Sequence, residues 1–205
     1  MEKRVSFLLI ALIVGFSFAA SALLFTESLE NIALLDRETI VLPVKAHIVM
    51  DESKEFESER TRENALLLFS GANRLWEKAH IFFEVESVSE IYLEKEAIEK
   101  MLEKEELTPI VENEAFGKGK VNVFFLKQIS GPSGRAITRE KIALVSDKPR
   151  FNDFRVLAHE LGHLLGLPHL KDTSMLMGEN CNGEALSKKE IVTVRRNAQA
   201  LAQNK

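Results

Sequence analysis

The stretch HELGHLLGLPH, residues 159–169, constrains the fold of this chain more than any other feature. It contains three of the chain's five histidines, His159, His163 and His169, with Glu160 between the first two. Residues four apart lie on the same face of an α-helix, so His159 and His163 are predicted to point at one common position. Zinc binds imidazole readily and is usually four-coordinate. Two histidines are too few ligands for such an ion, so a third ligand must come from another part of the chain.

Gly166 and Pro168 explain how a third histidine can reach the same ion. Glycine ends a helix easily because it adopts the left-handed conformation, and proline then prevents the helix from resuming. The chain can turn back and bring His169 to the metal. Three protein ligands leave one position open for water, as in catalytic zinc sites. Glu160 can take a proton as that water attacks a carbonyl, so the stretch predicts one catalytic Zn²⁺ and metal-assisted peptide hydrolysis.

Length, composition and charge indicate a single globular domain that does not bind nucleic acid. The 205 residues suffice for one ordinary domain, and 45% apolar with 28% charged residues is typical of a soluble core. The formal net charge of −4 gives no basic excess that would attract nucleic acid, so no nucleic-acid partner is expected. A single cysteine, Cys181, precludes an internal disulfide framework.

The N-terminus is predicted to be a targeting segment. Lys3 and Arg4 precede an uncharged apolar run, and Ala-Ser-Ala at 20–22 fits a signal-peptidase site. Two interpretations stay open: residues 1–22 are a cleaved signal peptide, or residues 5–25 are a retained signal anchor that spans the membrane. Both place the folded domain outside the cytoplasm, either secreted or membrane-anchored. The oligomeric state is left open.

The remaining pattern predicts one α+β (mixed α/β) domain. We expect a short linker at 23–37 and the domain at 38–205. Expected strands lie at 38–50, 81–91, 120–129 and 141–149, with a Gly/Pro loop at 130–140 that leads into a short extended piece. Expected helices are a long one at 65–79, the histidine-bearing one at 154–166 after an Asn152 or Asp153 cap, and a last one at 188–202 after a Ser187 cap.

A Lys/Glu-dense segment at 93–109 is predicted to be a helix that Pro109 ends. Its charge could mark a docking site, but a solvated surface helix with one apolar edge is the preferred interpretation, with Glu96 and Lys100 paired. His47 and His80 lie in or beside strand patterns. They are interpreted as ordinary histidines rather than metal ligands.

The long histidine motif resembles the HExxHxxGxxH signature of the metzincins, a clan of zinc endopeptidases. These enzymes also carry a Met-turn, a tight turn that places a methionine beneath the zinc. The stretch DTSMLMG offers Met175 and Met177, and Met177 is chosen because its Leu-Met pair resembles the matrixin turn. The resemblance implies a zincin domain with a twisted mixed sheet, a long backing helix, an active-site helix and a C-terminal helix.

The stretch GPSGRAIT resembles the matrixin segment that enters the edge strand above the cleft. In that family an extended substrate pairs with this edge through main-chain hydrogen bonds. The resemblance therefore implies a protein or peptide substrate. The implied substrate-backbone contacts are Gly134, Arg135, Ala136, Ile137 and Thr138.

The chain also departs from the better-known metzincin families. Leu170 follows the third histidine where matrixins have serine and astacins have glutamate, and Glu179 stands where astacins and serralysins place a tyrosine. The only tyrosine is Tyr92, so no tyrosine switch is available. The chain is therefore interpreted as a minimal matrixin-like metzincin outside those families.

Several alternatives remain beside this interpretation. Cys181 could bind the zinc and hold the enzyme latent, although an inert residue is preferred. Asn180 and Glu184 form an N-x-x-x-E arrangement in which Glu184 could be a gluzincin-type third ligand. Glu184 is instead expected at the start of the last helix. Two alternative functions are a non-catalytic zinc domain that binds peptides or a partner, and a zinc hydrolase of a non-protein amide.

Overall fold

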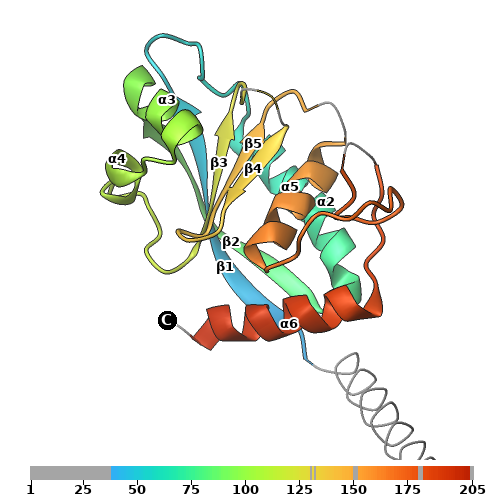
Figure 1. Ribbon diagram of the computed structural model, residues 1–205. Coiled ribbons are helices and arrows are strands. Elements are labelled where there is room, and N and C mark those ends of the chain that lie inside the picture. Colours follow the sequence, from blue (N-terminus) through green and yellow to red (C-terminus); the bar gives the residue numbers. More distant parts are fainter. Residues whose placement is uncertain (1–37, 130, 132, 150–151, 180–181, 204–205) are drawn as a thin grey trace, which may run out of the picture. The chain divides into compact units, whose positions relative to one another are not determined.

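The computed structural model of the chain describes residues 38–129, 131, 133–149, 152–179 and 182–203 (Figure 1). All of these residues lie in the unit Glu38–Lys205. The predicted signal peptide or anchor, the predicted linker, Asn180 and Cys181 lie outside the described residues.

The predicted strands and helices all occur, with ends that differ by a few residues, and Thr108–Val111 is an additional short helix. Their order is β1 (Ile40–Met50), α2 (Arg62–Trp76), the 3-10 helix η1 (Glu77–Ala79), β2 (Ile81–Tyr92), α3 (Lys95–Lys104), α4 (Thr108–Val111), β3 (Val121–Leu126), β4 (Gly134–Ile137), β5 (Ile142–Ser146), α5 (Asp153–Leu164) and α6 (Lys188–Gln203). The predicted α+β class, with a mixed sheet, a backing helix, an active-site helix and a C-terminal helix, is confirmed.

The sheet has five strands in the order β2-β1-β3-β5-β4. Strands β2, β1, β3 and β5 run parallel, and β4 pairs antiparallel with β5. Every residue of β3 and β5 is buried, because helices cover both faces of the sheet (Figure 1). Strand β4 is an edge strand whose second edge pairs with no other described strand.

Helix α2 backs the sheet and begins with a capping box. The Thr61 hydroxyl accepts a hydrogen bond from the Asn64 backbone N–H, and the Asn64 side chain accepts one from the Thr61 N–H, each 3.2 Å long. Its predicted apolar face is buried: Leu68, Phe69, Ala72 and Trp76. At Gly71 the helix passes so close to α5 that a Cβ there would lie 2.6 Å from the Phe154 Cβ.

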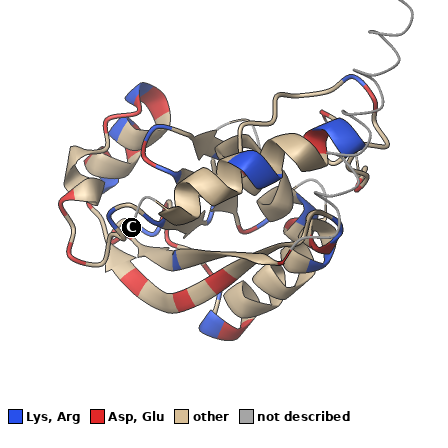
Figure 2. Ribbon diagram, turned by 90° about the horizontal axis from the view of Figure 1, so that it is seen from below, with Lys and Arg blue, Asp and Glu red and all other residues tan. Residues whose placement is uncertain are grey.

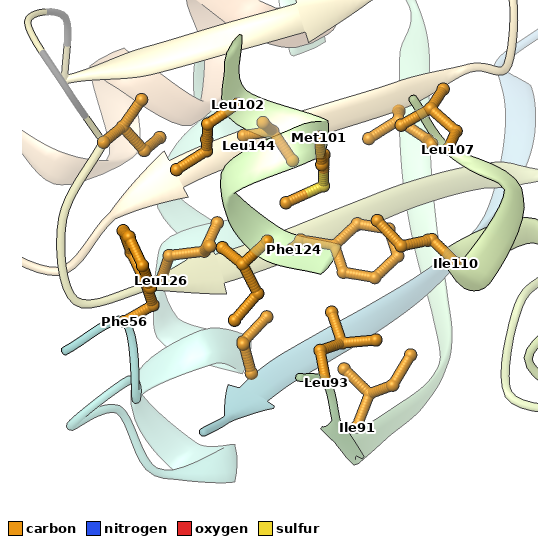
Figure 3. Close-up of a cluster of buried hydrophobic side chains, with 14 of the residues drawn as sticks. Phe56, Ile91, Leu93, Met101, Leu102, Leu107, Ile110, Phe124, Leu126 and Leu144 are labelled. Atoms are coloured by element: carbon orange, nitrogen blue, oxygen red, sulfur yellow. The ribbon is translucent and has the colours of Figure 1, made fainter. Parts of the chain in front are cut away.

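A second core fills the opposite face of the sheet (Figure 3). Helix α3 contributes Ile98, Met101 and Leu102, which pack over the sheet together with Phe124 and Leu144. The outer face of α3 carries the predicted Glu96–Lys100 pair, with 3.0 Å between the charged groups. The Lys/Glu-dense segment is therefore an amphipathic surface helix with a buried apolar edge.

The expected end of this segment at Pro109 was wrong. Helix α3 ends at Lys104, where Glu105 takes the left-handed conformation with φ 52°. Pro109 instead lies in the first turn of the separate helix α4. The first turn of a helix tolerates proline because its backbone N–H groups have no partner within the helix.

His47 is an ordinary core histidine, as predicted. Its side chain is buried, and its Nε2 lies 3.0 Å from the Asn122 Oδ1. Its ring stacks on Phe124 with 4.5 Å between centroids. Burial lowers the pKa of His47, which keeps the ring neutral inside the sheet.

Helix α6 closes the lower end of the sheet in Figure 1. The Ser187 hydroxyl accepts from the Glu190 backbone N–H, and the Glu190 carboxylate accepts from the Ser187 N–H, which confirms the predicted cap. The buried Arg195 donates to the carbonyls of Glu38, Ala79 and His80. This residue therefore links the last helix to the beginning of β1.

The outer faces of the helices and strands carry charged residues of both signs (Figure 2). Within the part of the chain that the structure describes, every helix is too short or too polar to cross a lipid bilayer.

The close crossing of α2 and α5 yields a stability prediction. Gly71→Val should lower the free energy of unfolding by about 1–3 kcal/mol, because the added side chain must displace Phe154. Ser70→Val places the same side chain on the exposed face of α2 and should cost less than about 1 kcal/mol. Urea unfolding measures both variants. Equal losses would contradict the proposed tight contact.

Candidate metal centre

Helix α5 places His159 and His163 one turn apart on the same face. The helix ends at Leu164, and Gly166 follows with φ 84°. The Gly166 N–H donates to the His163 carbonyl, and the Leu167 N–H donates to the Gly162 carbonyl at 3.0 Å. This pattern is a Schellman motif, the helix end that the glycine predicts.

The three histidines of the motif meet at one point. Nitrogen Nε2 of His159 lies 3.1 Å from that of His163 and 3.1 Å from that of His169. The Nε2 atoms of His163 and His169 are 3.0 Å apart. Among the described residues, these three form the one group of histidine, cysteine or acidic side chains close enough to share a metal ion.

The other nitrogen of each ring has an acceptor. Nδ1 of His159 donates to the Leu176 carbonyl and Nδ1 of His163 to the Leu167 carbonyl, both at 2.8 Å. Nδ1 of His169 lies 2.9 Å from a carboxylate oxygen of Glu179. A carbonyl or carboxylate oxygen can only accept, so each Nδ1 carries the proton of the neutral ring.

With the proton of each ring on Nδ1, the Nε2 atoms are free to bind a metal ion. All three Nε2 atoms present lone pairs to one another, an arrangement that repels unless a cation lies between them. Tetrahedral zinc with ordinary Zn–N bonds holds two nitrogens about 3.3 Å apart, a few tenths of an ångström more than here. The donor set of three imidazoles whose Nδ1–H groups are held by acceptors therefore fits zinc.

Burial keeps the rings in the form that binds metal. It lowers the pKa of His159 to about 4, against a weaker opposing effect of the hydrogen bond to Leu176. Burial also lowers the pKa of His163. Both rings therefore stay neutral at neutral pH, and only the neutral ring can offer Nε2 to a metal.

The chain turns tightly between Met175 and Gly178, next to α5. The Gly178 N–H donates to the Met175 carbonyl at 3.0 Å, which puts Leu176 and Met177 at the corner of the turn. Met177 is fully buried, and a Cβ on Gly162 would lie 2.6 Å from its sulfur. Gly162 lies between the two histidines of α5. The side chain of Met177 therefore packs directly against the metal-facing helix.

Arg155 holds this turn in place. It lies one helical turn before His159 and is buried, at 4% exposed. Its Nη2 donates to the carbonyls of Leu176 and Gly178, both at 2.7 Å, and its Nε donates to Gly183 at 3.1 Å. The Leu176 carbonyl thus accepts from both Arg155 and His159. One buried guanidinium couples the turn to the first histidine of the motif.

Glu160 faces the edge strand across the site. Its side chain is buried, at 6% exposed, and a Cβ on Gly134 would lie 2.6 Å from its Oε1. Any larger residue at this position of β4 would have to displace the Glu160 side chain. Burial raises the pKa of Glu160 to about 8, and the charges of Arg155 and Arg135 partly oppose this rise.

A cleft of about 680 Å³ runs between β4 and α5 and contains the histidines. Of the predicted substrate contacts, four line this cleft: Gly134, Arg135, Ala136 and Thr138. The fifth, Ile137, does not, and its side chain is buried in the second core. The cleft also exposes His159, Glu160, His163 and His169.

The expectation that Glu184 begins the last helix was wrong. It is exposed, and α6 starts four residues later at Lys188. Glu184 is absent from the group of side chains that could share a metal. Asn180 and Cys181 lie outside the described residues, so the latency hypothesis stays a prediction.

The sequence pattern of the Matrixin family matches residues 39–197. The chain belongs to the matrixin family. It is therefore a zinc-dependent metalloprotease, and the metzincin resemblance of the long histidine motif is confirmed. The interpretation that the chain lies outside the better-known metzincin families is not, because the matching family is the matrixins themselves. A comparison with curated proteins gave no match.

Several solved structures are similar to this matrixin at low sequence identity. Mature mirolysin of Tannerella forsythia, in complex with a cleaved peptide, aligns at 11% identity and TM-score 0.55 over 82% of this chain and 98% of its own. A chain in a chaperone–substrate complex aligns at 14% identity and TM-score 0.56, over 82% of this chain. This matrixin spans about a third (35%) of that chain. Archaemetzincin of Methanopyrus kandleri aligns at 19% identity and TM-score 0.46, over 81% and 95% of the two chains.

The sequence analysis missed Arg155 and the contact made by Glu179. Arg155 left a signal, because a charged residue one turn before His159 lies on the buried face of an apolar helix and must find partners there. Glu179 was noticed only as the absence of a tyrosine. Its contact with His169 depends on how two loops meet, which no local pattern reports.

Arg155 yields a prediction for this matrixin. Arg155→Leu should lower the free energy of unfolding of the metal-free protein by at least about 2 kcal/mol, since two buried carbonyls and one part-buried carbonyl lose a charged donor. Arg62→Leu removes an exposed arginine from α2 and should change stability by less than about 0.5 kcal/mol. Thermal unfolding compares the two variants. A neutral Arg155→Leu would contradict the role assigned to this side chain.

Proposed function

We propose that this matrixin is an endopeptidase that cleaves extended protein or peptide chains with one catalytic Zn²⁺. His159, His163 and His169 hold the ion, Glu160 acts as general base and then acid, and Met177 supports the site from below. The observation that carries the proposal is the convergence of three unprotonated Nε2 atoms beside a buried carboxylate. A bound zinc ion supplies Lewis-acid chemistry, which makes water nucleophilic near neutral pH and polarises the scissile carbonyl.

The position of Glu160 suits proton transfer. Its side chain lines the same cleft as the histidines, and Gly134 leaves space for it against β4. In the proposed reaction Glu160 accepts the proton of the attacking water. It then passes that proton to the departing amine, so the carboxylate is regenerated when the peptide bond breaks.

The open edge of β4 suits an extended substrate. Strand β4 pairs with β5 along one edge and with no described strand along the other. A peptide laid along this free edge could pair with the backbone of Gly134 to Thr138 and cross the cleft above the histidines. Main-chain pairing recognises any extended chain, so we propose an unfolded or flexible polypeptide as the substrate.

The proposal extends to the arrangement of the whole chain. Residues 1–22 would be a signal peptide or residues 5–25 a membrane anchor, residues 23–37 a linker and residues 38–205 the catalytic domain. Either targeting segment would place the peptidase outside the cytoplasm. Support comes from the positive start and the uncharged apolar run of the N-terminus.

Glu160→Gln provides the central test. The purified chain should cleave casein, and the variant should do so about 10²–10⁴-fold more slowly while it keeps its zinc, because only the base is removed. Glu184→Gln changes an exposed acid of a nearby loop in the same way and should cleave at the wild-type rate. Fluorescence of labelled casein and zinc content by mass spectrometry measure both properties. A zinc-loaded Glu160→Gln chain with full activity would refute the proposed role.

Gly134→Ala tests the close approach of β4 to the base. The added Cβ must push the Glu160 carboxylate aside, so cleavage should fall about 10–100-fold with unchanged zinc content. Ala136→Ser adds one atom two residues along the same strand and should have a smaller effect on kcat. Steady-state kinetics on a fluorogenic peptide compares the two. Equal kcat values for Gly134→Ala and wild type would show that Glu160 tolerates a neighbouring side chain.

A further inference from the structure

His169 is the most exposed of the three histidines and the only one outside α5. Its side chain is 48% exposed, and it belongs to the extended segment that follows Gly166. His159 and His163 gain rigidity from the helix, and backbone carbonyls accept from their Nδ1 atoms. His169 lacks both restraints, so another group must orient its ring.

Glu179 is that group in the structure. Its Oε1 lies 2.9 Å from Nδ1 of His169. The backbone brings the two residues together, because Leu170 pairs with Gly178 as a bridge and its N–H donates to the Met177 carbonyl at 2.9 Å. His169 precedes this bridge in one segment and Glu179 follows it in the other. The Met-turn thus also delivers a carboxylate to the third histidine.

We infer that Glu179 is a positioning residue that holds His169 in the orientation and tautomer needed to bind zinc. The inference rests on the proposed metal site. A carboxylate that accepts from Nδ1–H leaves Nε2 as the free lone pair and increases its strength as a donor to the metal. The Glu179 carboxylate also lies beside the site, where a negative charge favours the binding of a divalent cation.

The surroundings of the pair distinguish this role from that of an ordinary surface ion pair. Glu179 is 61% exposed, and an exposed pair contributes little to folding. Its loss should therefore leave the metal-free protein as stable as before. Its effect should appear only when His169 has to bind metal. Zinc affinity and folding stability are thus expected to respond differently to substitution of Glu179.

The experiment compares Glu179→Ala, Glu179→Gln and the control Glu184→Ala, which removes an exposed acid from the same loop region. Zinc affinity is measured by competition with a chromogenic chelator, and unfolding of the metal-free chains by calorimetry. Glu179→Ala should weaken zinc binding about 10–100-fold. Glu179→Gln keeps an acceptor for Nδ1 and should bind zinc at least as tightly as Glu179→Ala. Glu184→Ala should match the wild type.

Nuclear magnetic resonance of the histidine side chains supplies a readout that a merely structural role would not change. In the zinc-loaded wild type, each ligand histidine should show a protected Nδ1–H. In Glu179→Ala only the signal of His169 should be lost to exchange with water, because its acceptor is gone. The signals of His159 and His163 should remain, since their carbonyl acceptors are unchanged.

The outcomes separate this inference from the proposed function. A wild-type chain that binds no zinc would overturn the proposed metal site itself. A wild type that binds zinc, with Glu179→Ala within about threefold of its affinity, would overturn only the role of Glu179. A fall of more than about 4 °C in the unfolding temperature of metal-free Glu179→Ala would also overturn it, because Glu179 would then be a structural residue.

Discussion

The convergence of three imidazole Nε2 atoms within 3.1 Å is the constraint on which this structure depends. Three lone pairs that face one another repel, so the protein must hold them in place before a metal arrives. It does so from behind each ring, through two carbonyls and one carboxylate. Each acceptor belongs to a loop, to the turn or to the end of α5, and the surrounding structure holds these segments in place.

The parts of the fold that lie far from the site serve this arrangement indirectly. The close contact between α2 and α5 at Gly71 lets the histidine-bearing helix lie deep against its neighbour. Asn197 of α6 donates to the Leu165 carbonyl at 2.7 Å, at the point where α5 ends and the chain turns toward His169. Arg155 joins α5 to the turn at Met175–Gly178. Rigid supports of this kind keep a metal site in register.

Burial shifts the pKa values of the side chains in the cleft. The carboxyl of Glu160 is held in a poorly solvated place between α5 and β4, which raises its pKa, whereas burial lowers the pKa of His159. Both shifts favour neutral side chains in the metal-free protein. A divalent cation would reverse the balance for the carboxylate, because its positive charge favours the ionised form. The site therefore favours the binding of a cation. Without a cation, the buried side chains are most stable in their neutral forms.

The sequence alone determined the histidine triad, the helix that carries two of its members and the glycine that ends that helix. These features are local: helical spacing and the left-handed preference of glycine act over a few residues. It also indicated most of the strands, because alternating apolar patterns reflect burial. The predicted helix end at Pro109 and the predicted helix start at Glu184 were wrong. The limits of a helix within a polar segment depend on which side chains pack into the core.

Only the tertiary structure decided how distant segments meet at the metal. Arg155 and Leu176 are 21 residues apart, and Gly134 and Glu160 come from different layers of the fold. Glu179 reaches His169 through a backbone bridge between two loops whose conformations follow no simple period. Such contacts depend on packing of the whole domain, because a hydrogen bond forms only where both partners are brought within about 3 Å.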